Sequence, residues 1–449
     1  MVLTRLEAAR SRRRHRPAGP PPRPDLPVGT DALPQIRHIV VLMMENHSFD
    51  NYLGTLGRGD GLPPGASNDS ATGRTVPAHR LPTTVQRVGV PNQSWAATHE
   101  QWNAGANDGF VRSAERQRRD VPGDDAMGYW TEEDLPFYAG LARTFPLADR
   151  WFSSCLGPTF PNRRFLVAGT AHGLASDQLR RTVDRPANGT LFDLLNRHGI
   201  SWANYHPIRH GRALVGQAPG LHGTPWGRRL RVLLLKDRIK SAGGEIKSLL
   251  QFTADSFPLG LLGYARHVRS TDHFLRDAAA GTLPAVSIVD PDFRSNSEEN
   301  PQDIHNGEAF AAEIINAVLH GPAWPETLLV WCYDEHGGYY DHVPPPAAVE
   351  PDDRRPEAGG QWGYDRYGIR VPAVIVSPYA RPDYVSHVVH DHTSILKLIE
   401  TKWNLPPLTR RDQAADDLLD SLDLESAPHF LHPPVLPAPW VANGGSTPR

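Results

Sequence analysis

Four polar side chains follow directly after a short apolar run near the start of the chain. Residues 39–44 read IVVLMM, and the next four residues are Glu45, Asn46, His47 and Ser48. A continuous apolar run of this length is typical of a strand buried on both faces of a parallel sheet. Ligands of open α/β sheets bind at the carboxyl ends of such strands. The stretch therefore predicts a ligand site, or else a strand and a turn in which Ser48 caps a helix.

A second group of polar residues stands in the same relation to an apolar run. Residues 327–333 read TLLVWCY, and Asp334, Glu335 and His336 follow, with two glycines after them. Two adjacent carboxylates suit a hard cation, and glycines allow the backbone to approach it closely. The group predicts either one side of a metal site or an ordinary acidic turn.

A hydroxyl stands where the sequence predicts the start of a helix. Gly157 and Pro158 favour a tight turn, Thr159 follows them, and residues 165–171 continue the helix. The first turn of a helix offers unpaired N–H groups and the positive end of the helix dipole, which suit a phosphoryl oxyanion or a deprotonated hydroxyl. Capping of the helix by Thr159 is the alternative interpretation.

His99 lies in a segment that is dense in polar and aromatic side chains. Residues 95–110 read WAATHEQWNAGANDGF and include Trp102 and Asp108. Polar groups set among aromatic side chains are typical of ligand pockets. The segment therefore predicts a binding role for His99, with a structural role as the alternative.

The other predicted elements alternate between strands and helices. Further buried strands are expected at residues 200–205, 283–292 (ending in acids that include Asp290) and 371–377, and helices at 190–198, 307–319 and after 391. A loop with His305 precedes the helix at 307–319. Such alternation predicts an α/β fold with a mostly parallel sheet covered on both faces. Residues 228–240 alternate basic and apolar positions, which predicts a helix packing on the core or, alternatively, one lying on a membrane surface.

The composition favours one large domain with long ordered loops. The chain has 449 residues, 39% apolar, with 43 prolines, 39 glycines and a net charge of −3, so no global field attracts nucleic acid. Cys155 and Cys332 lie in apolar segments and form no ligand-spaced cluster, and no apolar run is long enough to span a membrane. We expect a single domain at 35–430, between a disordered Arg/Pro-rich tail at 1–34 and a Pro-rich tail at 431–449.

The basic N-terminal tail bears on cellular location. It contains seven arginines and one glutamate up to residue 24, and the adjacent arginines at 12–14 are compatible with a twin-arginine export signal. Prolines follow in place of the apolar segment that such a signal needs. We therefore expect a cytoplasmic protein, with secretion as the alternative.

Two carboxylate-bearing strand ends and a hydroxyl at a helix start together suit metal-assisted phosphoryl transfer. A divalent cation would lower the cost of ionising Thr159 and neutralise charge on the phosphoryl oxygens.

Five segments between residues 36 and 425 resemble one protein family. They read MENHSFDNYLG, GPTFPNR, WxxxHxxWN around His99, YDEHGGYYDHVPPP and DHTSILKLIE. Together they resemble the bacterial and plant non-specific phospholipases C and the related acid phosphatases of the alkaline-phosphatase-like superfamily. The resemblance implies a three-layer α/β/α sandwich, with Thr159 as the nucleophile where phosphatase relatives carry serine.

The resemblance also implies roles for the other polar residues. His99 would assist the phosphoryl or the leaving group, and Asn46 would act in catalysis as well as in ligation. Ligands of the divalent metal ion or of the phosphoryl group would be Glu45, Asn46, Asp334 and Glu335. Beyond what the resemblance implies, we expect substrate contacts from Asp108, Asn162, Asp290, His305 and His336.

The implied activity is hydrolysis of phospholipid-type phosphodiesters to diacylglycerol and a phosphorylated headgroup through a phosphothreonine. A phosphomonoesterase and a catalytically silent protein that binds lipid or phosphate are the alternatives. The substrate implies transient contact with a membrane surface and no nucleic-acid partner. One departure concerns leaving-group protonation: the family usually has a histidine before the proline at 301, where this chain has Asn300, and His305 is displaced by several residues.

Overall fold

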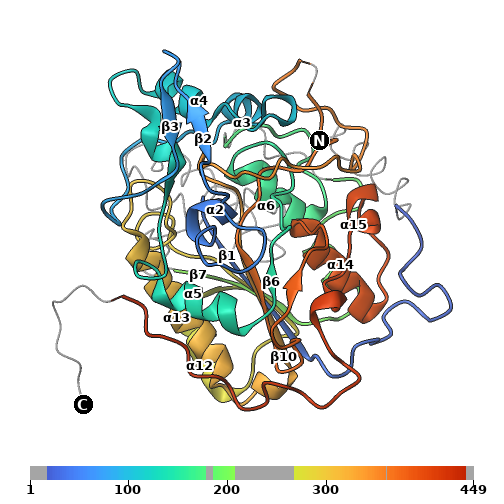
Figure 1. Cartoon of the computed structure of the whole chain (residues 1–449). Helices are drawn as coiled ribbons and strands as arrows, with labels where there is room; N and C mark the ends of the chain where they lie inside the picture. The colour runs from blue at the N-terminus through green and yellow to red at the C-terminus, as the bar shows by residue number, and fades with distance from the viewer. Residues whose placement is uncertain (1–17, 178–185, 208–266, 361, 441–449) are drawn as a thin grey trace, which may run out of the picture.

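An eight-stranded sheet forms the centre of the fold in the computed structural model, which describes residues 18–177, 186–207, 267–360 and 362–440 (Figure 1). The strands are β1 (His38–Met44), β6 (Leu147–Ala148), β7 (Trp202–His206), β8 (Val268–Ser270), β9 (Val286–Val289), β10 (Thr327–Tyr333), β11 (Ala373–Val376) and β12 (Val385–Ser386). Their order is β12-β6-β11-β10-β1-β9-β7-β8. β11 is antiparallel to both neighbours, and the other pairs are parallel. The predicted α/β class and mostly parallel sheet are confirmed.

Helices pack on both sides of this sheet, which gives three layers (Figure 1). The helices are α2 (Phe49–Tyr52), α3 (Trp95–Trp102), α4 (Phe110–Gln117), α5 (Pro136–Thr144), α6 (Thr159–Ala168), α7 (Leu191–Arg197), α12 (Thr271–Ala280), α13 (Ile304–Leu319), α14 (His392–Trp403) and α15 (Arg410–Ala414). On one side α13 packs with α5 and α12, and on the other α14 packs with α6 and α15. Two small two-stranded sheets join β2 (Ser67–Asp69) to β3 (Thr75–Pro77) and β4 (His79–Arg80) to β5 (Gly128–Tyr129).

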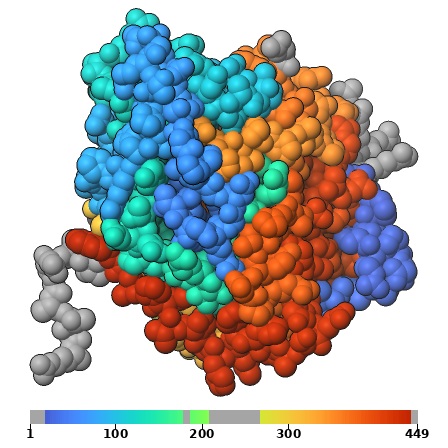
Figure 2. Space-filling model, viewed as in Figure 1, coloured from blue at the N-terminus to red at the C-terminus, as the bar shows by residue number. Residues whose placement is uncertain are grey.

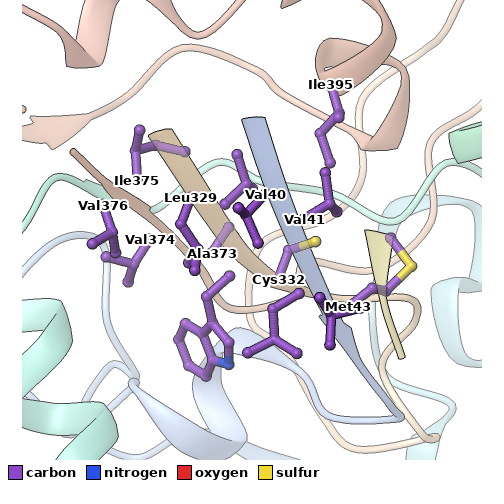
Figure 3. Packing of buried hydrophobic residues seen from close by; sticks show 14 of the residues in the cluster. Val40, Val41, Met43, Leu329, Cys332, Ala373, Val374, Ile375, Val376 and Ile395 are labelled. Carbon is purple, nitrogen blue, oxygen red and sulfur yellow. The ribbon is translucent and has the colours of Figure 1, made fainter. Parts of the chain in front are cut away.

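The two central strands carry the apolar runs that the sequence shows most clearly. β1 and β10 are parallel neighbours in the register Met44↔Tyr333, and β10 is buried along its whole length. Figure 3 shows Val41 and Met43 of β1 beside Cys332 of β10 in the core. Because parallel strands end at the same edge of a sheet, the residues after Met44 and after Tyr333 emerge side by side.

Most predicted elements are present, with shifted ends. Residues 283–292 were predicted as one strand, but β9 covers only 286–289. Pro284 and Pro291 flank it, and proline has no N–H for the ladder. The predicted helix at 228–240 lies outside the described residues. No helix in the described ranges combines the length and the apolar character needed to cross a bilayer.

The expected N-terminal tail requires a correction for residues 18–34. This segment packs beside α14, where Figure 2 shows it in deep blue next to red. The Lys402 ammonium pairs with Asp31 at 2.7 Å, and the Asn404 amide nitrogen donates to the backbone carbonyl of Arg23 at 2.8 Å. These contacts order a segment whose composition alone predicts disorder. At the other end, residues 431–440 lie on the surface near α5 and α13, where Trp440 stacks on His305.

Candidate active site

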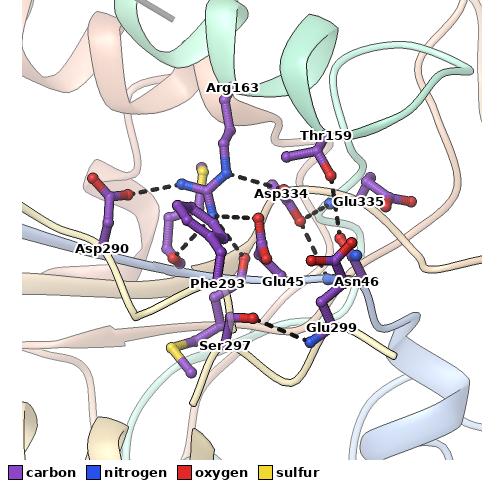
Figure 4. Close-up of polar contacts among 12 residues, drawn as sticks. Glu45, Asn46, Thr159, Arg163, Asp290, Phe293, Ser297, Glu299, Asp334 and Glu335 are labelled. Carbon is purple, nitrogen blue, oxygen red and sulfur yellow. Dashed lines mark hydrogen bonds and ion pairs between the residues drawn. The ribbon is translucent and has the colours of Figure 1, made fainter. Parts of the chain in front are cut away.

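The ends of β1 and β10 bring together the four predicted ligands, as Figure 4 shows. Glu45, Asn46, Asp334 and Glu335 are all buried. One carboxylate oxygen, Asp334 Oδ1, accepts from the backbone N–H groups of Asn46 (3.2 Å) and Glu335 (2.8 Å). Gly337 has a φ of 66°, and a Cβ there would lie 2.0 Å from the Asn46 carbonyl oxygen. Glycine is therefore required at 337 for the close approach of the two strand ends, whereas the sequence pointed only to close approach of the backbone to a cation.

Thr159 is the first residue of α6, and its hydroxyl does not cap the helix. Pro158 occupies the N-cap position without a side-chain hydrogen bond, and the Phe160 N–H donates to Asp177 Oδ1 at 2.8 Å. The Thr159 Oγ1 instead lies 3.5 Å from the side-chain amide of Asn46. Of the two interpretations that the sequence left open, the structure favours the hydroxyl facing the ligand cluster.

Asn162 holds the turn that presents Thr159. Its amide nitrogen donates to the carbonyl oxygens of Gly157 (2.8 Å) and Pro158 (3.1 Å), and its oxygen accepts from the Cys155 N–H at 3.0 Å. All of its polar atoms are engaged by the turn, so the predicted substrate contact is not what the structure shows. Asn162 instead fixes the position of the hydroxyl.

Arg163, which no pattern in the sequence singled out, is the positively charged side chain of the cluster. It follows Thr159 by one helical turn and is buried. Its guanidinium contacts Asp290 at 2.7 Å, Asp334 at 3.0 Å and Glu45 at 3.7 Å. The i, i+4 spacing on α6 was a signal that could have placed both side chains on one helix face. The contact with Arg163 accounts for the burial of Asp290. Through this contact Asp290 helps to hold the Arg163 guanidinium in place.

The charges of this cluster do not balance among the described residues that form it. Arg163 offers one positive charge to Glu45, Asp290 and Asp334, and Glu335 adds a fourth carboxylate. Burial and the neighbouring Asp334 carboxylate raise the pKa of Glu335 well above its ordinary value, and burial raises the pKa of Asp334. Two adjacent buried carboxylates can both be ionised only with added positive charge. The cluster therefore fits a cation.

The side-chain amide of Asn46 can face the carboxylates in two orientations, one of which suits a cation. With its nitrogen toward the carboxylates, it donates to Glu335 Oε1 at 2.8 Å and to Asp334 Oδ1 at 3.2 Å. With its oxygen toward them, three acceptor oxygens converge and need a cation between them. Oxygen ligands at about 2.1 Å from a small divalent ion lie about 3 Å from one another, which matches these separations. The donor set is all oxygen, as hard divalent cations prefer.

His336, one of the predicted substrate contacts, is a neutral neighbour of Glu335. The Gln101 amide nitrogen donates to the Asn92 carbonyl, so Gln101 Oε1 faces His336 Nε2 at 2.7 Å and accepts its hydrogen. Burial lowers the pKa of His336 to about 3, so the ring is neutral and Nδ1 is an acceptor. This Nδ1 lies 3.2 Å from Glu335 Oε2. The neutral His336 ring therefore adds no positive charge beside the Glu335 carboxylate.

A second acidic group nearby already has its counter-charge. Asp50, Asp341 and His342 place ligand atoms within 4.8 Å of one another. The buried Arg370 guanidinium contacts Asp341 at 2.8 Å and Asp50 at 3.2 Å, and His342 Nδ1 lies 2.7 Å from Asp50 Oδ2. We interpret this group as a structural ion network at the start of α2, because Arg370 supplies the charge that a cation would.

His99 lies on α3, which packs against the turn before Thr159. The Trp95 ring of α3 is next to Gly157, where a Cβ would lie 2.9 Å from it. The His99 Nδ1–H donates to the Trp95 carbonyl at 2.7 Å, which leaves Nε2 as the acceptor. Burial lowers the pKa of His99 to about 4, so the ring is neutral at pH 7. His99 can therefore act as a base at Nε2.

Two predicted substrate contacts are not brought to the cluster. Asp108 is half-exposed, and its carboxylate pairs at 2.8 Å with the guanidinium of Arg112, which lies on α4. His305 lies in the first turn of α13, where its Nε2–H donates to the Asp134 carbonyl at 3.0 Å. His305 therefore does not replace the missing family histidine. Asn300 does not replace it either, because its amide nitrogen donates to the Val90 carbonyl at 2.6 Å.

We expect Arg163→Met to lower the free energy of unfolding by about 3–5 kcal/mol, because it leaves three buried carboxylates without their partner. Urea titration of the metal-free protein at neutral pH measures this loss. Arg143→Met is the matched control, because Arg143 pairs with Glu132 on the surface and should contribute less than about 1 kcal/mol. Equal losses in the two variants would contradict the role assigned to Arg163.

Comparisons with known proteins cover the part of the chain that contains this cluster. The family model of the phosphoesterase family matches residues 36–406. Phospholipase C B of Mycobacterium tuberculosis (strain ATCC 25618 / H37Rv) is 31% identical over an alignment of 446 residues, covering 89% of this chain and 80% of that protein. Non-specific phospholipase C6 of Arabidopsis thaliana is 29% identical over 440 residues, covering 90% and 75%. A solved structure of a protein in the alkaline phosphatase superfamily from Vibrio parahaemolyticus aligns with a TM-score of 0.40 at 9% identity, over 88% of this chain and 72% of that chain.

Proposed function

Because the chain belongs to the phosphoesterase family and hydrolyses phosphoesters, we propose that it is a metal-dependent phosphodiesterase of the phospholipase C type. Its substrate would be a phospholipid, and its products diacylglycerol and the phosphorylated headgroup. The observation that carries the mechanism is the Thr159 hydroxyl, which faces the Asn46 amide at the end of β1 instead of capping α6.

The proposed metal ion would be held by Glu45, Asn46, Asp334 and Glu335. When bound, it would supply positive charge that favours the ionised hydroxyl and the phosphoryl oxygens. Arg163 would keep Glu45 and Asp334 oriented and ionised at the same time. Asn162 would hold the Thr159 oxygen in place, so that little reorganisation is needed at the moment of attack.

The proposed reaction has two displacements at phosphorus. In the first, the Thr159 hydroxyl gives up its proton and its oxygen forms a bond to phosphorus, the bond to the glycerol oxygen breaks, and that oxygen takes up a proton. The product of this step is a phosphothreonine that carries the headgroup. In the second, water attacks the same phosphorus and gives up a proton, the bond to Thr159 breaks, and the Thr159 oxygen takes up a proton again.

His99 suits the proton transfers on the leaving-group side. Its Nε2 is a neutral acceptor in the protein without substrate, so it can take the proton of the attacking water. The imidazolium formed in this way can give the proton to the glycerol oxygen that leaves in the first step of the next turnover. The anionic substrate favours that charged form by Coulomb attraction.

We expect His99→Asn to slow hydrolysis of the phosphothreonine by about 10²–10⁴-fold, the usual contribution of a general base. With p-nitrophenyl phosphorylcholine the first step should still give a burst of nitrophenol, because this leaving group needs no protonation. Stopped-flow absorbance measures the burst and the slow phase separately. Loss of the burst together with the slow phase would contradict this assignment of His99.

The substrate class is tested by rates measured side by side on one purified sample. The panel contains a phosphatidylcholine, p-nitrophenyl phosphorylcholine and p-nitrophenyl phosphate, with metal content determined on the same protein. We expect the diesters to be preferred. Preference for the monoester would point to a phosphatase, and liposome binding without turnover of any ester would point to a silent lipid-binding protein.

A further inference from the structure

The imidazole of His99 is held between aromatic side chains from two parts of the chain. The Trp362 ring stacks on it with centroids 4.2 Å apart and an interplanar angle of 22°. The Trp95 ring lies 4.7 Å from it at 42°. The hydrogen bond from His99 Nδ1 to the Trp95 carbonyl sets the tautomer. The stacked Trp362 ring restricts rotation of the imidazole about its bond to Cβ.

The segment that carries Trp362 is fastened to α3 through alternate residues. The Tyr364 ring meets Trp95 edge to face at 5.7 Å, and its hydroxyl donates to the Leu174 carbonyl at 2.7 Å. The Arg366 guanidinium lies over Trp102 at 4.6 Å. Trp362, Tyr364 and Arg366 thus contact His99, Trp95 and Trp102, which lie along one face of α3 at helical spacing. Trp362 is thereby fixed over His99.

We propose that Trp362 is a positioning residue for His99, holding the imidazole so that Nε2 faces the reacting phosphoryl group and covering one ring face against water. This inference rests on the proposed role of His99 as a base. Trp362 touches His99 and is 37% exposed. The fold therefore depends little on it, and its effect passes through His99.

Removal of the Trp362 ring should change the pKa of His99, which can be measured. Burial is the largest cause that lowers the pKa of His99, whereas the Asp365 carboxylate and the Trp95 carbonyl act in the opposite direction. Removing the Trp362 ring admits water but leaves Asp365 and Trp95 in place. The pKa should then rise from about 4 toward its ordinary value of 6.5. The neutral ring is the base, so activity falls when the ring is protonated. As the pH is lowered, the variant should therefore lose activity at a higher pH than the natural protein.

The test compares Trp362→Ala with Trp362→Phe, which restores a flat ring. Trp440→Ala is the control, because Trp440 stacks on His305 in a similar way, at 4.6 Å and 17°, and is 45% exposed. We expect Trp362→Ala to slow hydrolysis of the phosphothreonine by about 10-fold through loss of orientation. It should also shift the acid limb of kcat to higher pH. Trp362→Phe should recover most of the rate, and Trp440→Ala should leave both rate and pH profile unchanged.

A second readout separates this inference from the proposed reaction. The imidazole resonances of His99, assigned with His99→Asn, are titrated by NMR without substrate. A rise of the titration midpoint in Trp362→Ala, reversed in Trp362→Phe, supports the positioning role even if His99 plays no part in turnover. An unchanged midpoint in Trp362→Ala, or a phenylalanine variant as altered as the alanine variant, overturns it.

Discussion

Replacing Thr159 by valine should lower turnover of p-nitrophenyl phosphorylcholine by about 10³-fold or more, because it removes the attacking oxygen and nearly preserves the shape of the side chain. The Thr159 Oγ1 makes no capping contact in α6, so the fold loses little. Steady-state rates and thermal unfolding of the same preparation measure both effects. Thr159→Ser is the matched control, because it keeps the oxygen and should retain most of the activity.

Two outcomes of this experiment would contradict the assignment. One is a valine variant with a rate close to that of the natural protein. The other is a serine variant that is as inactive as the valine variant while both are folded and bind metal normally. In either case the oxygen of residue 159 would not be the group that attacks phosphorus.

Replacing Glu335 by glutamine should release the metal ion and lower turnover by about 10³-fold, since several kcal/mol of charge stabilisation depend on the ion. The same loss is expected when metal is removed from the natural protein by chelation, and adding divalent ions should restore activity there. Metal affinity should weaken as the pH falls, because burial and Asp334 raise the pKa of Glu335 and protons then compete with the cation.

His342→Gln is the control for the metal site. It alters the second acidic group, whose charge Arg370 already balances, so metal content and turnover should stay near those of the natural protein. Metal analysis of dialysed samples distinguishes the two groups. Loss of metal in His342→Gln, with metal retained in Glu335→Gln, would place the ion in the second acidic group and contradict the proposed site.

The sequence predicts the strand ends well because their signals are local. The apolar runs before Glu45 and Asp334 mark β1 and β10, and the predicted span 327–333 is the observed one. That these strands are neighbours is a property of the whole sheet and has no local signal. The glycine after His336 carries part of the information, because the Asn46 backbone allows no side chain there.

The direction of side chains is what the sequence could not decide. Thr159 starts a helix in either interpretation, and only the position of Asn46 relative to α6 distinguishes an attacking hydroxyl from a cap. The sequence does not single out Arg163, because arginines on helices usually face solvent, and its burial follows from carboxylates directly after β1, β9 and β10. Asp108 was assigned from the composition of its segment, and the start of α4 directs it to Arg112 instead.

The mass of the protein after rapid acid quenching tests the central claim most directly. The protein is mixed with p-nitrophenyl phosphorylcholine, quenched within one turnover, digested and analysed by mass spectrometry. We predict one phosphorylcholine group on the peptide that contains Thr159, present during turnover and enriched in His99→Asn. Release of nitrophenol with no such adduct, or an adduct on another residue, would contradict the account.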